Sequence, residues 1–326
     1  MAMREIKYAD ALREALAEEM RRDERVFVYG EDVELGYAFT VCKGLIEEFG
    51  RERVFDTPIC EQTIVGVAVG AAMMGMRPVP EIQFLDLITM CMDQVCNSAA
   101  KLRYMSGGQV KFPLVVRAPA GKWGGFAAQH SQTFDAWFLN VPGLKVAVPA
   151  TPYDAKGLLK TAIRDDNPVL FIERKLLYQT TGPVPEEEYL IPFGEARIHR
   201  QGKDVTIVAI GRMVLEALKA AEQLEKEGVQ VTVVDPRTLV PLDTKTILDS
   251  VRQTHRVVIV EEGPKRGGVG GEIGAMIAEE VLDELDAPIR RVAALDTPIP
   301  FNPVLENYVL PNDQKIVDTV RDLMSF

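Results

Sequence analysis

The sequence predicts an α/β protein with two domains: a larger domain built on a parallel sheet, followed by a smaller α/β domain. Short, almost continuously apolar segments alternate with helical segments along most of the chain, which is typical of parallel strands covered on both faces. This alternation stops over residues 175–194, where several prolines and an acidic triplet indicate a linker. The length of 326 residues fits two domains of roughly 150 residues each. We expect them to span residues 1–185 and 186–326.

The first domain is expected to begin with a helix over residues 8–20, because its apolar side chains recur every three or four residues. An apolar, glycine-containing helix is expected directly after Glu61, and Gly66, Gly70 and Gly75 would let it lie close against another element. A long helix is expected over residues 86–105. The predicted strands are residues 25–30, 53–59, 79–84, 113–119, 145–150 and 168–174.

The second domain repeats the alternation more regularly. Strands are predicted over residues 204–211, 229–235, 256–262 and 289–296, and helices over 213–228, 241–251 and 272–285. A glycine-rich stretch, residues 267–271, lies between the third strand and the third helix, where a phosphate-binding turn would be found. The dinucleotide fingerprint fails because Ile273 stands at its third glycine position, so we interpret this stretch as a tight turn.

Composition excludes several classes of function. The chain has 37 basic and 48 acidic residues, a net charge of −11, which argues against binding nucleic acid or an anionic membrane. Its longest apolar run, residues 64–76, is shorter than the ~20 residues of a membrane-spanning helix, and its N-terminal segment is charged, unlike a signal peptide. The four cysteines form no CxxC pair, and the three histidines provide little for a zinc site. We expect a cytoplasmic protein.

One candidate for chemistry is Glu61, where a predicted strand turns into a helix. The carboxyl ends of parallel strands are where open α/β sheets bind ligands. Apolar residues follow Glu61 immediately, and a poorly solvated carboxylate is suited to proton exchange near neutral pH. The alternative is a structural carboxylate that is favoured by the dipole at a helix N-terminus.

The other candidate is His130, in the glycine-rich segment of residues 121–132. A histidine on a loop that follows a strand can act as an acid or a base. A lone histidine is also often structural, so both interpretations stay open.

These two segments, in this order, resemble the β subunit of the thiamine-diphosphate-dependent E1 component of 2-oxo acid dehydrogenase complexes of the pyruvate, branched-chain 2-oxo acid or acetoin type. The resemblance implies a pyrimidine-binding domain followed by a transketolase C-terminal-type domain. It extends over GEDV (30–33), DTPICE (56–61), EIQFLD (81–86), AAKLRYMSGG (99–108), AAQHSQ (127–132), PGLKV (142–146), TPYDAKGLL (151–159), AIRDDNPV (162–169), GKDVTIVAIG (202–211), VVDPRTLVPLD (233–243) and VEEG (260–263).

The resemblance also implies roles for individual residues. Glu61 matches the carboxylate that bonds a ring nitrogen of the cofactor's aminopyrimidine, and His130 matches a catalytic histidine near the substrate and the incoming lipoyl group. The matching neighbours are Glu31, Ile59, Gln83 and Leu87 around the pyrimidine, and Phe84 and Gln129 beside the substrate. A monovalent-cation site, usually for K⁺, matches Leu114, Ala162, Ile163, Asp165 and Asn167; the alternative is an ordinary turn capped by Asp165 and Asn167.

Members of this family hold Mg²⁺ and the diphosphate with a Gly-Asp-Gly segment, and this sequence has none. The resemblance therefore implies that a separate α chain supplies this half of the site, in an α2β2 complex that serves a lipoyl-bearing E2. The expected substrate is pyruvate or a branched-chain 2-oxo acid. Leu87 stands where relatives commonly have an aromatic residue, and other segments resemble acetoin-cleaving members, so acetoin is the alternative. More distant alternatives are a self-sufficient transketolase-like enzyme and a mainly structural, E2-docking subunit.

Overall fold

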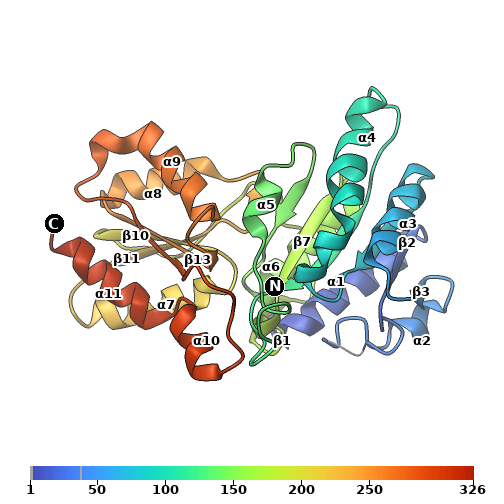
Figure 1. The fold of residues 1–326 in the computed structure, drawn as a ribbon, viewed down its shortest axis with the longest axis horizontal. Coiled ribbons are helices and arrows are strands. Elements are labelled where there is room, and N and C mark those ends of the chain that lie inside the picture. The colour runs from blue at the N-terminus through green and yellow to red at the C-terminus, as the bar shows by residue number, and fades with distance from the viewer. Residues whose placement is uncertain (1–2, 37–38) are drawn as a thin grey trace. The chain divides into compact units, whose positions relative to one another are not determined.

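The computed structural model describes residues 3–36 and 39–326 (Figure 1). The chain forms two compact units. The first comprises Met1–Ala120 and Trp137–Phe193, and the second comprises Gly121–Ala136 and Gly194–Phe326. The segment that carries His130 therefore groups with the second unit, although it lies in sequence between parts of the first. Among the described residues, no helix combines the length and the apolar character needed to cross a membrane.

The first unit is built on parallel strands, which neighbour one another in the order β6-β7-β5-β4-β2-β3. Most of their residues are buried, as expected for strands covered on both faces. Each coincides with a strand predicted from the sequence, so that part of the prediction is confirmed. The bounds are β2 Val26–Gly30, β3 Val54–Asp56, β4 Arg77–Glu81, β5 Val115–Ala120, β6 Lys145–Ala147 and β7 Val169–Arg174.

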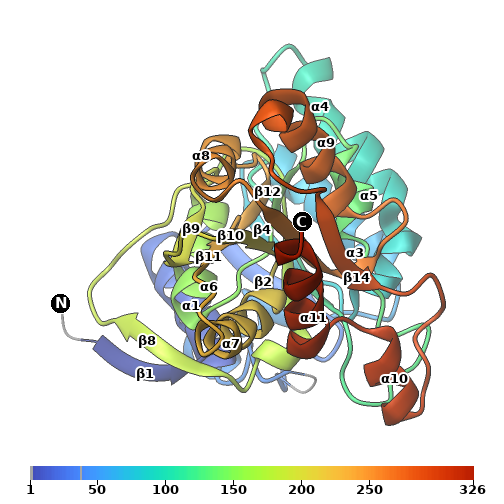
Figure 2. The same cartoon turned by 90° about the vertical axis from the view of Figure 1, so that its left-hand side faces the viewer.

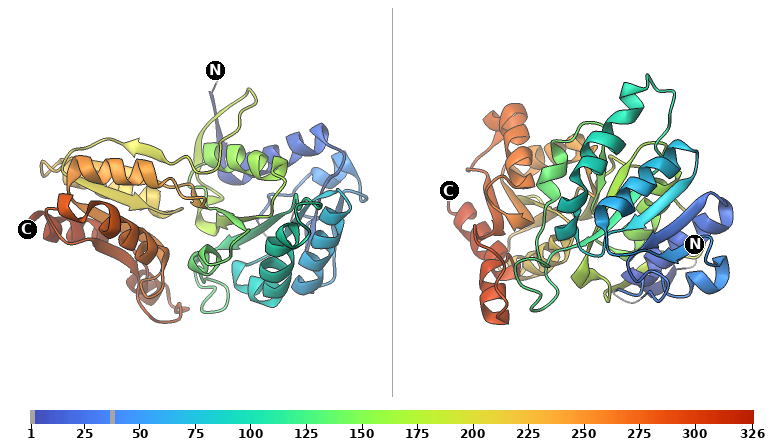
Figure 3. Two further views of the ribbon diagram at one scale, coloured as in Figure 1. Left: turned by 90° about the horizontal axis from the view of Figure 1, so that it is seen from above. Right: turned by 45° about the vertical axis from the view of Figure 1, so that its right-hand side comes forward.

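Helices cover both faces of this sheet. On one face α1 (Tyr8–Arg22) packs against α6 (Pro152–Arg164), and on the other α3 (Glu61–Met73) lies beside the helical segment that ends in α4 (Ala100–Met105) (Figure 3, left). Ion pairs such as Arg164–Glu19, 2.7 Å apart, join α1 to α6. The short helices α2 (Leu45–Phe49) and α5 (Asp135–Leu139) complete the set.

The sequence-based prediction is wrong at two places in this unit. The expected continuous helix over residues 86–105 is a 3₁₀-helix at Leu85–Cys91, a π-helix at Asp93–Ala99 and only then α4, and a three-to-four-residue apolar spacing does not distinguish these forms. Part of the expected linker is a strand, β8 (Thr181–Pro185), which pairs antiparallel with β1 (Met3–Lys7). The prolines of β8 are tolerated because both strands of a two-stranded sheet are edge strands, and proline is accepted in an edge strand. The short 3₁₀-helix Lys175–Leu177 precedes β8.

The second unit has a sheet of order β14-β13-β10-β11-β9, parallel except for the edge strand β9. Helices α7 and α11 lie on one face, and α8 and α9 lie on the other (Figure 2). The predicted strands and helices are confirmed, whereas β9, β12, α10 and α11 were missed. The bounds are β9 Arg197–Arg200, β10 Val205–Ala209, β11 Val231–Asp235, β12 Thr238–Val240, β13 Val257–Pro264, β14 Arg290–Ala294, α7 Met213–Glu225, α8 Thr244–Thr254, α9 Val269–Val281, the 3₁₀-helix Leu282–Glu284, α10 Pro303–Val309 and α11 Asp313–Met324.

Candidate active site

The residues expected around the cofactor's pyrimidine ring gather at the carboxyl ends of three neighbouring strands. Gly30, the last residue of β2, is in register with Asp56 at the end of β3 and with Glu81 at the end of β4. The residues that follow these three strand ends therefore share one edge of the sheet. They are Glu31 after β2, Ile59 and Glu61 after β3, and Gln83 and Leu87 after β4.

Glu61 is the first residue of α3 and is partly buried. A carboxylate is stabilised at a helix N-terminus by the helix dipole. It also interacts electrostatically with Glu31: burial is the main cause that raises the pKa of Glu31, and the charges of Asp32 and Glu61 raise it further. Glu31 therefore retains a proton more readily than an exposed carboxyl group.

Cys91, in the 3₁₀-helix after β4, lies on the buried side of the same region. Burial raises the pKa of its thiol to about 12, with a further contribution from Glu61. The thiol therefore stays protonated at neutral pH, and the side chain is part of the buried core.

Phe84 is fixed from several sides. The Lys175 ammonium lies 5.0 Å from the centre of its ring, and Phe39 packs edge-on against it with 6.0 Å between ring centres. Phe39 in turn stacks on Tyr178, whose hydroxyl donates to Glu173. The aromatic side chain proposed for the substrate side is therefore held against a rigid support.

A buried charged cluster beneath this edge was missed by the sequence analysis. Arg117 of β5 donates to Glu173 of β7 at 2.7 Å and to Glu81 of β4 at 2.7 Å, and it is fully buried. Burial raises the pKa of Glu173, and the neighbouring Arg117 lowers it. The signal that could have revealed this cluster is a charged residue inside an apolar strand, as in LVVRAP and LFIER, because buried charges are seldom tolerated unless they are paired.

The segment of residues 121–132, which we call the His130 loop, belongs to the second unit. It is closed at its base by the Gly121 N–H, which donates to the Gln132 carbonyl at 3.0 Å. His130 is partly buried and Gln129 is exposed, and the ring of Phe126 lies 6.4 Å from that of His130. The structure thus groups these two expected residues on one closed loop.

The five residues expected to form a cation site also come together, around the turn after α6. The Asp165 carboxylate accepts from the backbone N–H of Asn167 at 2.8 Å and from its side-chain amide at 2.7 Å, so the capped turn is confirmed. The carbonyl of Ile163 accepts from Arg77 at 2.8 Å, that of Leu114 from the Val169 N–H at 2.8 Å, and that of Ala162 from the Asp165 N–H at 3.2 Å.

The glycine-rich stretch of the second unit is a tight turn, as expected. Glu261 of β13 accepts from the backbone N–H groups of Val269 and Gly270 at 2.8 and 2.9 Å, so a carboxylate of the chain itself already occupies the N-terminus of α9. A methyl group on Gly268 would lie 2.5 Å from Glu261 Oε1. Burial raises the pKa of Glu261 to about 7. This turn leaves no place for a phosphate.

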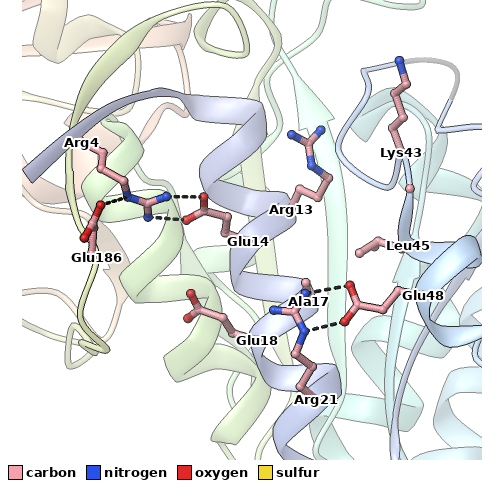
Figure 4. A pocket seen from close by; sticks show the side chains of 11 residues that line it. Arg4, Arg13, Glu14, Ala17, Glu18, Arg21, Lys43, Leu45, Glu48 and Glu186 are labelled. Atoms are coloured by element: carbon pink, nitrogen blue, oxygen red, sulfur yellow. Dashed lines mark hydrogen bonds and ion pairs between the residues drawn. The ribbon is translucent and has the colours of Figure 1, made fainter.

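A polar cavity of about 540 Å³ in the first unit contains none of the predicted site residues (Figure 4). Opposite charges pair across it, as in Arg4 with Glu14 at 2.9 Å and Arg21 with Glu48 at 2.7 Å. We assign no chemistry to it. Its lining residues are Arg4, Arg13, Glu14, Ala17, Glu18, Arg21, Lys43, Gly44, Leu45, Glu48 and Glu186.

The sequence matches two family models that together cover most of the chain. Residues 4–181 match the transketolase pyrimidine-binding domain, and residues 194–316 match the transketolase C-terminal domain. A solved structure entitled "Split gene transketolase, inactive beta4 tetramer" superposes with a TM-score of 0.80 at 27% sequence identity, and the match covers 98% of each chain. The fold and the matched domains thus define a transketolase-type, thiamine-diphosphate-dependent protein.

Curated relatives narrow this class. The chain is 49% identical over 314 residues to the pyruvate dehydrogenase E1 component subunit beta of Rhizobium meliloti, covering 96% of this chain and 68% of that protein. It is 47% identical to the 2-oxoisovalerate dehydrogenase subunit beta of Bacillus subtilis (98% and 99% covered) and 46% identical to the acetoin:2,6-dichlorophenolindophenol oxidoreductase subunit beta of the same species (98% of each). The chain belongs to the family of E1 β subunits of 2-oxo acid and acetoin dehydrogenases.

Proposed function

We propose that the chain is the β subunit of a heteromeric, cytoplasmic E1 enzyme that decarboxylates pyruvate or a branched-chain 2-oxo acid and transfers the acyl group to the lipoyl domain of E2. The observation that carries this proposal is the pair Glu31 and Glu61 at the carboxyl edge of the first sheet. These carboxyl groups, with the exposed apolar side chain of Ile59 beside them, fit a flat ring that carries a basic nitrogen.

Thiamine diphosphate, when bound, supplies the carbanion chemistry of the reaction. In our proposal Glu61 shares a proton with a ring nitrogen of the pyrimidine, and its place at the start of α3 fixes the carboxylate relative to the sheet edge. Glu31, Gln83, Ile59 and Leu87 orient the ring from the neighbouring strand ends. Burial raises the pKa of Glu31, so this carboxyl group retains a proton at the sheet edge more readily than an exposed one.

We assign roles toward the substrate to Phe84 in the first unit and to Gln129 and His130 in the second unit, each taken by itself. His130 would exchange a proton with the substrate or with the lipoyl group, because an imidazole can do both near neutral pH. We expect His130→Ala to reduce acyl transfer to the lipoyl domain more than it reduces binding of thiamine diphosphate, as measured by reductive acylation and by cofactor titration. Reductive acylation at the wild-type rate would refute this role.

We further propose that Mg²⁺ and the diphosphate are held mainly by a separate α chain, in an α2β2 complex. The sequence lacks a Gly-Asp-Gly segment, and α3 with the residue that follows it presents exposed apolar side chains, Val67, Met73 and Met74. Met74 is 84% exposed, and a methyl group placed on Gly70 would meet no atom within 4 Å among the described residues. Exposed apolar surface of this kind marks interaction sites.

A K⁺ ion bound to the turn after α6 is the remaining part of the proposal. Leu114, Ala162 and Ile163 offer carbonyl oxygens that each accept one protein hydrogen bond, and a carbonyl oxygen has a second lone pair. Asp165 and Asn167 close the same turn. Asp165 also pairs with Lys145, and the side-chain carbonyl of Asn167 accepts from Arg103, so the backbone carbonyls are the ligands we propose. The ion would brace the turn rather than take part in the reaction.

The second candidate substrate is acetoin. It is favoured by Leu87, an aliphatic residue at a position where the family resemblance implies an aromatic one. A pocket of different shape around Leu87 would change which substrate binds, but Glu61 would still share a proton with the pyrimidine ring. A mainly structural, E2-docking role is the third candidate, and it predicts that Glu61 is dispensable.

The test is substrate-dependent reduction of an artificial electron acceptor by this chain purified with its α partner, with and without thiamine diphosphate and Mg²⁺. Pyruvate, branched-chain 2-oxo acids and acetoin are compared side by side. Cofactor-dependent activity supports the proposal, and the preferred substrate decides between the first two candidates. Glu47→Gln, an exposed carboxylate on α2, is the matched control for Glu61→Gln. Equal activity of the two variants would favour the structural role.

A further inference from the structure

The base of the His130 loop lies against the acidic end of β13. Gly121, the first residue of the loop, has φ +79°, and a methyl group at this position would lie 3.0 Å from Oε2 of Glu262. At the other end of the loop, the Thr133 carbonyl lies 3.4 Å from where a methyl group on Gly263 would be. The two ends of the loop therefore lie against two consecutive residues of the strand, Gly121 against Glu262 and Thr133 against Gly263.

Glu262 is itself fixed. Arg212, immediately before α7, donates from Nε to Oε1 of Glu262 at 3.2 Å and from Nη1 to Glu216 at 3.0 Å. Only 3% of Glu262 and 8% of Arg212 are exposed. A buried carboxylate is costly unless it is paired, so this ion pair determines where the Glu262 carboxylate lies.

The loop is also held along its length. Lys122 donates to the side-chain carbonyl of Asn307 at 2.7 Å, and its ammonium lies 4.0 Å from a carboxylate oxygen of Glu306. A methyl group on Gly125 would lie 3.6 Å from the ring of Phe301. Between these contacts Gly124, Gly125 and Ala127 have left-handed backbones, so this part of the loop is neither a helix nor a strand. The conformation of the loop therefore depends on its contacts with neighbouring residues.

We propose that Glu262, held by Arg212, is a positioning residue that sets the conformation of the His130 loop for acyl transfer. The proposal rests on the role assigned to His130 above. If Glu262 shifts, the backbone at Gly121 loses the carboxylate against which it packs, and His130 at the other end of the closed loop moves with it. The consequence falls on the step that uses His130 rather than on the steps that use Glu61.

The first test compares Glu262→Gln with Glu216→Gln in the complex of this chain with its α partner. Glu216 has the same arginine partner and lies in the first turn of α7, so it is the matched control. We expect Glu262→Gln to lower the ratio of lipoyl acylation to dye reduction at least tenfold and to raise the KM for the lipoyl domain, whereas Glu216→Gln leaves the ratio within twofold. A general loss of structure would lower both rates together and leave the ratio unchanged, which would overturn the proposal.

The double variant Arg212→Gln/Glu262→Gln tests whether Arg212 acts through Glu262. Arg212 keeps Glu216 as a partner once Glu262 is neutral, so we expect its removal to change the ratio by less than twofold beyond the effect of Glu262→Gln. A further large loss would overturn the role given to Arg212. An inactive wild-type complex would refute the proposed function itself. An active wild type in which His130→Ala lowers acyl transfer and Glu262→Gln does not would refute only the positioning role.

A second measurement needs no activity. Trp123 lies in the His130 loop, and Trp137→Phe would make it the only tryptophan of the chain. In that background we expect Glu262→Gln, or Gly121→Ala if the former does not fold, to increase acrylamide quenching of Trp123 about twofold. Unchanged quenching would show that the Glu262 contact does not determine the loop conformation.

Discussion

Glu261 provides the sharpest test of the second unit, because its pKa is raised from an ordinary value of 4.5 to about 7 by burial. Between pH 4.5 and pH 7 the folded state then binds more protons at Glu261 than the unfolded state does. The contribution of Glu261 to stability is therefore greatest below pH 4.5 and falls as the pH rises toward 7. The two pKa values differ by about 2.5, and each pKa unit corresponds to about 1.36 kcal/mol. Protonation of Glu261 can therefore contribute about 3 kcal/mol to the free energy of unfolding. About 2–3 kcal/mol of this should be lost between pH 5 and pH 8.

Glu261→Gln removes the titration and keeps the shape of the side chain. We expect the variant to be less stable at pH 5, because its amide serves the N–H groups of Val269 and Gly270 less well, and to approach the wild type as the pH rises. The assay is urea unfolding from pH 5 to pH 8. Glu272→Gln, an exposed carboxylate on the same helix, is the control and should follow the wild type. A stability difference that stays constant with pH would refute the reasoning.

Three further predictions follow from the first unit. Glu61→Gln should lower turnover by about 10²–10⁴ while folding and assembly persist, as measured by dye reduction and by gel filtration; turnover near the wild-type value would contradict its role. Gly70→Leu should leave the isolated chain folded, because a methyl group there meets no described atom within 4 Å outside its chain neighbours and its own helix backbone, yet weaken capture of the α partner; undiminished capture would argue against α3 as an interface. K⁺ should raise the thermal midpoint by about 2–4 °C relative to Na⁺ at equal ionic strength, and equal midpoints would argue against a K⁺ site.

The sheet was predictable because its strands are buried on both faces and therefore consist of apolar runs. The β1–β8 pair was not, since Pro183 and Pro185 make β8 look like a linker and its partner lies at the far end of the same unit in sequence. Local spacing also could not show that Leu85–Cys91 is a 3₁₀-helix and Asp93–Ala99 a π-helix, because the periods of the three helix types are too similar to be separated over segments this short.

In the candidate site, too, residues defined by their own segment could be predicted, and residues brought together by the fold could not. Glu61 could be located from its own segment, because a strand end followed by an apolar helix defines its surroundings. Arg117 and Glu173 lie 56 residues apart and meet only once β5 and β7 are adjacent in the sheet. The grouping of the His130 loop with the second unit likewise depends on contacts with Glu262 and Phe301, which are more than a hundred residues away in sequence.

The α3 helix connects the fold to the proposed assembly. It is apolar along almost its whole length, and Gly66 and Gly70 remove side chains where another backbone could approach, yet the described chain places only Gln94 near Gly66 and nothing near Gly70. A helix apolar on every side is normally enclosed. The same helix begins with Glu61, so a partner that covers its outer face would also lie close to the edge where the pyrimidine is proposed to bind. The missing Gly-Asp-Gly segment and the uncovered α3 face are independent observations, and both are explained if one α chain supplies the diphosphate site and the missing surface together.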